Sequence, residues 1–148
     1  MVSIAVQPPF QARAGNTLSP PIIIERDTRL TGTDAGLMFA MAVLCEKGEL
    51  VTEHLDGTLV ASETVIEEYG TRKIIFIFHE LAIRYPGKYT VRVDIYKMND
   101  QAAKMVTQAE TRIFNIYEDD VPSEMPSKLF VLLTVKAKAL LRRWEPAL

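Results

Sequence analysis

The chain has 148 residues, of which 48% are hydrophobic and 24% charged, with a formal net charge of −2. These values are typical of one globular domain, residues 1–148, and they disfavour a disordered chain. The slightly negative net charge also excludes a global electrostatic attraction to nucleic acid or to anionic membranes, so any such binding must come from a local patch.

The first predicted strand covers residues 2–7, where Val2, Ile4 and Val6 alternate with other residues and should share one face. Residues 7–25 then hold two proline pairs around a short polar stretch, which predicts a rigid crossover between strands. A second strand is expected at residues 22–24. The run LMFAMAVLC, residues 37–45, is apolar on both faces, which favours a central strand of a sandwich, with a helix as the alternative that periodicity alone leaves open.

The middle of the chain predicts several further strands. A hairpin turn at residues 46–49 leads to a short strand at 50–51, and another short strand is expected at 58–62. Residues 73–78, KIIFIF, are β-branched or aromatic and predict a strand. After a Pro-Gly turn, residues 88–97 have the clearest alternation in the chain, with Tyr89, Val91, Val93 and Ile95 on one face.

The last part of the sequence predicts a polar loop at residues 98–108, a strand at 109–117 and a short helix beginning at Ser127 and ending near residue 134. Six to eight short strands with little helix predict an all-β antiparallel sandwich of about seven strands.

Charge is distributed unevenly along the sequence. Residues 34–70 contain eight acidic side chains and one basic one, whereas residues 71–114 contain eight basic and four acidic ones. Two interpretations remain open: the charges solvate the outer faces of strands, or the molecule has separate acidic and basic surfaces for different partners.

The sequence offers no constellation of catalytic residues. His54 and His79 are the only histidines, and the His79-Glu80 pair lacks the second histidine of a zinc-protease motif. Cys45, the only cysteine, cannot form an intramolecular disulfide and lies in an apolar run, where a buried inert thiol is expected. We therefore predict no enzyme, no metal, no cofactor and no small-molecule substrate. The sequence has neither a signal peptide pattern nor a run long enough to span a bilayer, so no membrane association is expected.

Three blocks of the sequence resemble the velvet domain of fungal regulatory proteins. The first contains Gln7, Pro9, Ala12, Arg13 and Ala14, followed by PPII at residues 20–23, and is similar to the Q-Q-P-x-x-A-R-A and P-P-I-V elements. The second is the most specific: GTLVAS at 57–62 and FIFHELAIRYPGKYTVRVDIY at 76–96. The third is FNIY at 114–117 with MPSKL at 125–129.

The resemblance implies an immunoglobulin-like β-sandwich related to the Rel-type DNA-binding domains, to which the helix predicted from Ser127 would add a short C-terminal helix. It also implies regulation of fungal development and secondary metabolism, as a homodimer or as a heterodimer with another velvet-family protein, in the nucleus and cytoplasm. The alternative is a sandwich that binds a protein partner and never contacts DNA.

Candidate functional residues follow from the same comparison. The family has a basic loop of the type C-G-x-G-x-K-D-R-R where this chain has Gly-Asn-Thr-Leu-Ser, residues 15–19. The remaining candidates for DNA contact are Arg13, Arg26 and Arg29, so we expect weak binding. For Arg13 the alternative is a surface arginine that bonds loop carbonyls. The candidates for a dimer interface are Leu129, Phe130, Leu132 and Leu133, for which core packing is the alternative.

Overall fold

The computed structural model describes residues 2–27, 38–68, 70–99 and 102–119. These residues form thirteen β-strands and one short 3-10 helix, more strands than the seven or so expected, because several strands have only two or three residues. The strands are β1 (Val2–Val6), β2 (Gln11–Arg13), β3 (Ile22–Asp27), β4 (Met38–Glu46), β5 (Glu49–Leu50), β6 (Leu55–Asp56), β7 (Val60–Ser62), β8 (Thr64–Glu68), β9 (Thr71–Phe78), β10 (Ala82–Ile83), β11 (Gly87–Met98), β12 (Ala103–Glu110) and β13 (Phe114–Tyr117), and the helix is η2 (Thr52–His54).

The strands assemble into two larger sheets and one small one. The four-stranded sheet has the order β1-β3-β9-β8, and the seven-stranded sheet has the order β2-β13-β11-β4-β5, with β12 beside β11 and β7 beside β4. A two-stranded sheet joins β10 to β6. Every pairing is antiparallel except that of β2 with β13. The all-β class with antiparallel sheets is confirmed.

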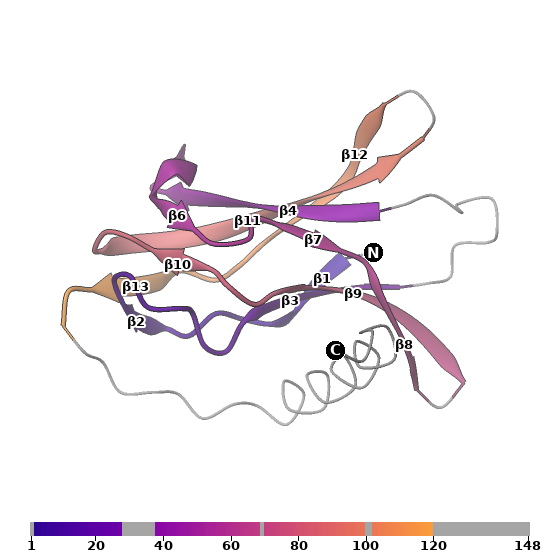
Figure 1. The fold of residues 1–148 in the computed structure, drawn as a ribbon, viewed down its shortest axis with the longest axis horizontal. Coiled ribbons are helices and arrows are strands. Elements are labelled where there is room, and N and C mark those ends of the chain that lie inside the picture. Colours follow the sequence, from indigo (N-terminus) through magenta and orange to yellow (C-terminus); the bar gives the residue numbers. More distant parts are fainter. Residues whose placement is uncertain (1, 28–37, 69, 100–101, 120–148) are drawn as a thin grey trace, which may run out of the picture.

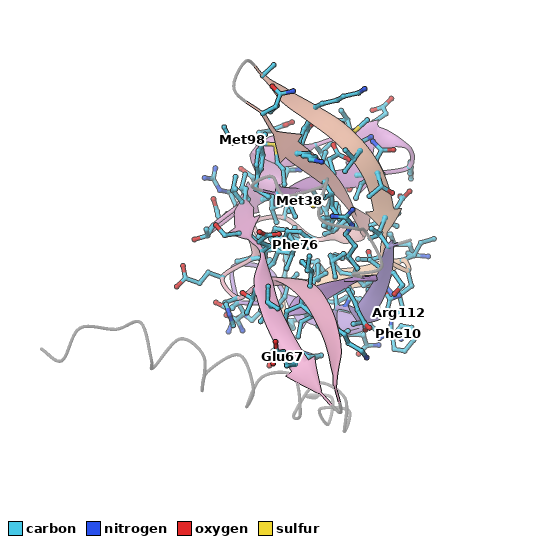
Figure 2. The ribbon with its side chains drawn as sticks, turned by 90° about the vertical axis from the view of Figure 1, so that its right-hand side faces the viewer. Phe10, Met38, Glu67, Phe76, Met98 and Arg112 are labelled. Carbon is cyan, nitrogen blue, oxygen red and sulfur yellow. The ribbon has the colours of Figure 1, made fainter. Side chains whose placement is uncertain are left out.

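The two larger sheets lie face to face and enclose the main core (Figure 1). The alternation predicted for residues 88–97 is confirmed, because Tyr89, Val91, Val93 and Ile95 all point into this core and are at most 1% exposed. From the facing sheet come Ile22, Ile24, Phe76 and Phe78, and Figure 2 shows Phe76 between the two layers.

A second apolar cluster lies on the outer face of the four-stranded sheet. It consists of Val6, Ile23, Ile66 and Ile75, with Ala5 and Ile77 packed at its margin. These residues alternate with the core residues along β3 and β9, so they point away from the main core. The expectation that Val2, Ile4 and Val6 share one face is wrong at Val6, because the register of β1 shifts between Ile4 and Val6.

The predicted loop at residues 98–108 is also wrong in its second half. β11 and β12 form a long hairpin, and β12 occupies Ala103–Glu110. The strand predicted at 109–117 is broken at residues 111–113, where the buried Thr111 hydroxyl accepts a hydrogen bond from the Val91 N–H, 2.9 Å away. The helix predicted from Ser127 lies outside the described residues.

The crossover at residues 7–25 connects the two sheets. It leaves β1, adds β2 as a parallel strand beside β13 and returns to the four-stranded sheet as β3. Backbone hydrogen bonds hold it on the way: Gly15 N–H donates to Ile83 O and Leu18 N–H to Leu81 O, each at 2.8 Å. The segment therefore seals the edge of the seven-stranded sheet at β13.

Candidate interaction surface

Arg13, the first candidate for DNA contact, extends from the exposed side of β2. Its Nε donates a hydrogen bond to the Glu118 carbonyl oxygen at 3.2 Å. This contact ties β2 to the chain that follows β13. It matches the alternative interpretation, in which Arg13 bonds loop carbonyls.

Arg26, the second candidate, lies near the end of β3 on the core side of the four-stranded sheet. Its guanidinium contacts the Met38 sulfur, and it lies close enough to the Glu63 carboxylate to affect it. Burial raises the pKa of Glu63, and the charge of Arg26 opposes this increase. Arg26 is therefore half-buried beside a carboxylate, which is a poor position for contacting phosphate.

The structure does not bring Arg13 and Arg26 together. Arg13 lies beside β13, which pairs with β11 at its Gly87 end. Arg26 contacts Met38, and Met38 pairs with Lys97 near the other end of β11. Ten residue steps of strand separate these ends, which corresponds to roughly 30 Å at about 3.3 Å per residue. Arg29, the third candidate, lies outside the described residues, as do Leu129, Phe130, Leu132 and Leu133.

The acidic and basic halves of the sequence are not separate in space. They supply neighbouring strands: β4 pairs with β11, β6 with β10 and β8 with β9. Ion pairs link basic side chains to carboxylates at Arg84–Asp56 (2.7 Å), Arg92–Asp94 (2.9 Å) and Lys73–Glu25 (3.1 Å). This arrangement favours solvated strand faces over a bipolar molecule.

A group of exposed and half-buried apolar side chains lies on the outer face of the seven-stranded sheet. We call it the methionine–aromatic patch, and it consists of Phe39, Met41, Val60, Tyr96, Met98 and Met105. The strand register places these residues together, because Tyr96 is opposite both Phe39 and Met105, and Met41 is opposite Val60. The rings of Phe39 and Tyr96 stack with centroids 5.2 Å apart. The exposed fraction is 38% for Met41, 44% for Val60, 49% for Met98 and 47% for Met105.

A buried polar network adjoins this patch. Asp94 is only 4% exposed and accepts hydrogen bonds from Arg92 Nε and from Gln108 Nε2, both at 2.9 Å. The Arg92 charge compensates the buried carboxylate, and Gln108 links β12 to β11. The network fixes the base of the hairpin, and Met98 lies toward its tip (Figure 2).

The patch was not among the sequence-predicted candidates. The sequence contained one indication of it: two methionines, Met98 and Met105, in a region predicted to be a polar loop. Only the pairing of β12 with β11 brings these methionines close to Phe39 and Met41. The three tyrosines of this region lie in three different environments. Tyr89 is in the core, Tyr96 lies in the patch, and Tyr85 is 52% exposed with its ring in an edge-on contact with His54.

Nothing in the described part of the chain resembles a reactive centre. Cys45 is buried, and burial raises the pKa of its thiol, with a further increase from Glu110. Among the described residues no three His, Cys, Asp or Glu side chains are grouped as metal ligands. None of the described helices is long and apolar enough to cross a membrane.

The fold and this surface define an all-β domain with an exposed apolar face and dispersed, mostly paired arginines. The family model described as velvet factor matches residues 38–121, which is more than half of the chain. The chain belongs to the velvet factor family. No curated protein matches it. The matched range contains the whole methionine–aromatic patch, whereas Arg13 and Arg26 precede it.

Proposed function

We propose that this chain is a velvet-type regulatory domain of fungal development and secondary metabolism that acts as a homodimer or as a heterodimer with another velvet-family protein. It would work in the nucleus and cytoplasm, and its own DNA contact would be weak or dependent on the partner. Membership of the velvet factor family supports the regulatory role.

The methionine–aromatic patch is the observation that supports dimerisation. Methionine and aromatic side chains are enriched in protein interfaces, and contiguous exposed apolar surface marks such sites. The patch lies on regular strands whose positions are fixed by register on both sides, so it presents a preformed surface. A partner that covers it would remove apolar area from water without requiring this sheet to rearrange.

An immunoglobulin-like fold is part of the proposal. The Tyr89 hydroxyl, near the start of β11, donates a hydrogen bond to the Tyr85 carbonyl at 2.9 Å. Such a bond to the backbone a few residues upstream is a feature of immunoglobulin-type sandwiches, where the tyrosine begins a central strand.

Sedimentation equilibrium tests the dimer surface. Met105→Glu places a charge in the patch and should shift the chain toward monomer, alone or mixed with a velvet-family partner. Ile113→Glu is the matched control, because Ile113 is 63% exposed but lies outside the patch, and it should leave association unchanged. Circular dichroism confirms that the variants are folded. If both variants associate as strongly as the unmodified chain, the dimer interface lies elsewhere.

The second candidate is a domain that binds a protein partner without contacting DNA. It is favoured by the roughly 30 Å of strand between Arg13 and the neighbourhood of Arg26, a separation that keeps these two candidates from sharing one short stretch of phosphates. Gel shifts at low and physiological salt separate the two candidates. For the first, weak binding should appear at low salt and collapse at physiological salt, and Arg13→Ala should weaken it almost equally across DNA sequences. No shift at either salt, with or without a partner, supports the second.

A further inference from the structure

Methionine side chains form much of the methionine–aromatic patch. Met41, Met98 and Met105 are 38%, 49% and 47% exposed, whereas Met38, in the same strand as Met41, is 3% exposed. An exposed thioether is open to oxidation by peroxides, which converts a flexible apolar side chain into a polar sulfoxide. The patch therefore combines an apolar surface with side chains whose polarity an oxidant can change.

Met105 has a polar contact to its sulfur atom. The side-chain amide nitrogen of Gln108, Nε2, lies 3.4 Å from Met105 Sδ and 2.9 Å from Asp94 Oδ1, and it donates to both. Asp94 is 4% exposed, and two hydrogen bonds from Arg92 hold its carboxylate. An amide nitrogen carries two N–H groups, so one can serve the carboxylate while the other points to the sulfur. The Met105 sulfur is thus held at the margin of the buried polar network.

This contact suits a sulfoxide better than a thioether. A thioether sulfur is a weak acceptor, whereas the oxygen of a sulfoxide is polar and accepts hydrogen bonds well. After oxidation, the Gln108 N–H that points to the sulfur would reach the new oxygen, and the N–H to Asp94 would stay in place. The product would be stabilised within the fold while the patch lost apolar surface, so a partner would bind it less tightly.

We propose that Met105 is a site of reversible oxidation by hydroperoxides, at which Gln108 holds the sulfoxide and the modification weakens association through the methionine–aromatic patch. A sulfur lone pair attacks the terminal peroxide oxygen, the S–O bond forms as the O–O bond breaks, and the hydroxyl proton passes to the departing oxygen, which leaves as water or an alcohol. The sulfur loses two electrons and the peroxide gains them. A dithiol-dependent sulfoxide reductase reverses the step, releasing the oxygen as water and forming a disulfide. The effect on association rests on the proposed dimer surface, whereas the oxidation site itself does not.

Peptide mapping by mass spectrometry tests the site in the full chain. The protein is treated with graded hydrogen peroxide, and sulfoxide is quantified at each methionine, with Cys45 monitored in the same digests. Met105 should oxidise at least about tenfold faster than the buried Met38, and methionine sulfoxide reductases should remove the oxygen. Met105 that stays reduced until Met38 is oxidised would overturn the proposal, as would a sulfoxide that the reductases leave in place.

Thermal unfolding tests the role of Gln108 on a Met41→Leu, Met98→Leu background, in which Met105 is the remaining methionine of the patch. Oxidation should lower the unfolding midpoint by at least about 3 °C more in Gln108→Leu than in the chain that retains Gln108, because the sulfoxide loses its donor. Gln108→Asn, which shortens the side chain by one methylene, repeats the comparison if Gln108→Leu does not fold. Equal shifts with and without Gln108 would contradict the proposed site.

Sedimentation equilibrium measures the consequence for association, with each variant compared with its own untreated sample. Peroxide should weaken association of the unmodified chain by about tenfold, and reductase should restore it. Met105→Leu should lose less than about twofold, whereas Met98→Leu, the matched control, should lose about as much as the unmodified chain. Equal losses in both variants would show that the effect does not come from Met105.

The two proposals fail in different ways. If the untreated chain does not associate through the patch, alone or with a velvet-family partner, the proposed dimer surface is wrong, and the peptide map and the Gln108 comparison still decide the oxidation site. If the untreated chain does associate through the patch, its Met105 should oxidise more slowly at high protein concentration, because the partner covers the side chain. Association through the patch with Met105 resistant to peroxide even in dilute protein would leave the dimer surface intact and overturn the oxidation site.

Discussion

Gly57 occupies a position where the backbone geometry leaves no room for a side chain. It has a φ of +108°, and a Cβ atom there would lie 1.5 Å from the Glu80 carbonyl oxygen. The close approach joins the loop before β7 to the turn after β9. Gly57 opens the GTLVAS block, so this part of the family resemblance has a structural cause.

Gly57→Ala should therefore lower the free energy of unfolding by at least about 2 kcal/mol, because both the positive φ and the clash with backbone oppose the new side chain. Gly48→Ala is the control, since Gly48 has a φ of +80° but nothing within 4 Å of its Cβ position, and it should cost about 1 kcal/mol. Urea denaturation measures both. Equal losses would mean that Glu80 moves away at little cost.

Tyr89 is a buried residue whose hydroxyl group makes a specific hydrogen bond to the backbone. Tyr89→Phe retains the ring but leaves the Tyr85 carbonyl without this donor, so the free energy of unfolding should fall by about 1 kcal/mol. Tyr96→Phe, in the exposed patch, should change it by less than about 0.5 kcal/mol. A negligible effect at Tyr89 would show that water replaces the bond and would weaken the immunoglobulin-type assignment.

At the scale of elements, an exposed ion pair lies beside the two-stranded sheet of β6 and β10. Arg84 donates to both carboxylate oxygens of Asp56 at 2.8 Å, and these bonds lower the pKa of Asp56. A carboxylate with a lowered folded-state pKa contributes stability above its unfolded-state pKa of about 3.9, and that contribution is lost as pH falls through the folded-state value.

Asp56→Asn should consequently be less stable than the unmodified chain at pH 6, and the difference should shrink as pH falls below about 4. Thermal unfolding between pH 6 and pH 3 measures this. Arg84→Gln is the matched variant: it removes the other partner of the same ion pair and should show the same convergence. A constant difference at all pH values would contradict the assignment of the effect to this carboxyl group.

The elements differ in how well the sequence predicts them, and exposure explains the difference. β11 is flanked by β4, β12 and β13 and buries every second side chain, so its alternation is visible in the sequence. β12 lies at an edge with most of its side chains exposed, so no apolar period marks it. β2 has three residues and exists because it pairs with β13, a contact that local propensity does not encode.

The candidate site was predicted less well than the fold. Arg13 and Arg26 are thirteen positions apart in sequence, but the crossover carries them to opposite ends of the sandwich. The patch likewise needs four strands from distant parts of the chain. Both depend on topology, which the alternation of side chains along a strand does not determine.

At the scale of the whole molecule, Cys45 reports on the opening of the sandwich. It is 7% exposed in β4, which has β11 on one side and β5 and β7 on the other. Reaction with a thiol reagent should be slow in the native protein and should accelerate with urea along the global unfolding curve, because burial limits access and raises the thiol pKa. Ser62→Cys on a Cys45→Ala background should react fast without denaturant. Rapid labelling of native Cys45 would indicate local opening of β4.

The parallel pairing of β2 with β13 also constrains the time at which the domain can form during synthesis. Arg13 pairs with Tyr117, so β2, near the beginning of the chain, can form its strand hydrogen bonds only after β13, the last described strand, has been synthesised. Such distant pairings slow folding, typically to milliseconds or seconds in all-β domains. On the ribosome, β2 would emerge with its partner still unsynthesised, and the edge of β13 would be sealed only after translation of nearly all the described sequence. A nascent chain shorter than about 117 residues should therefore remain sensitive to protease.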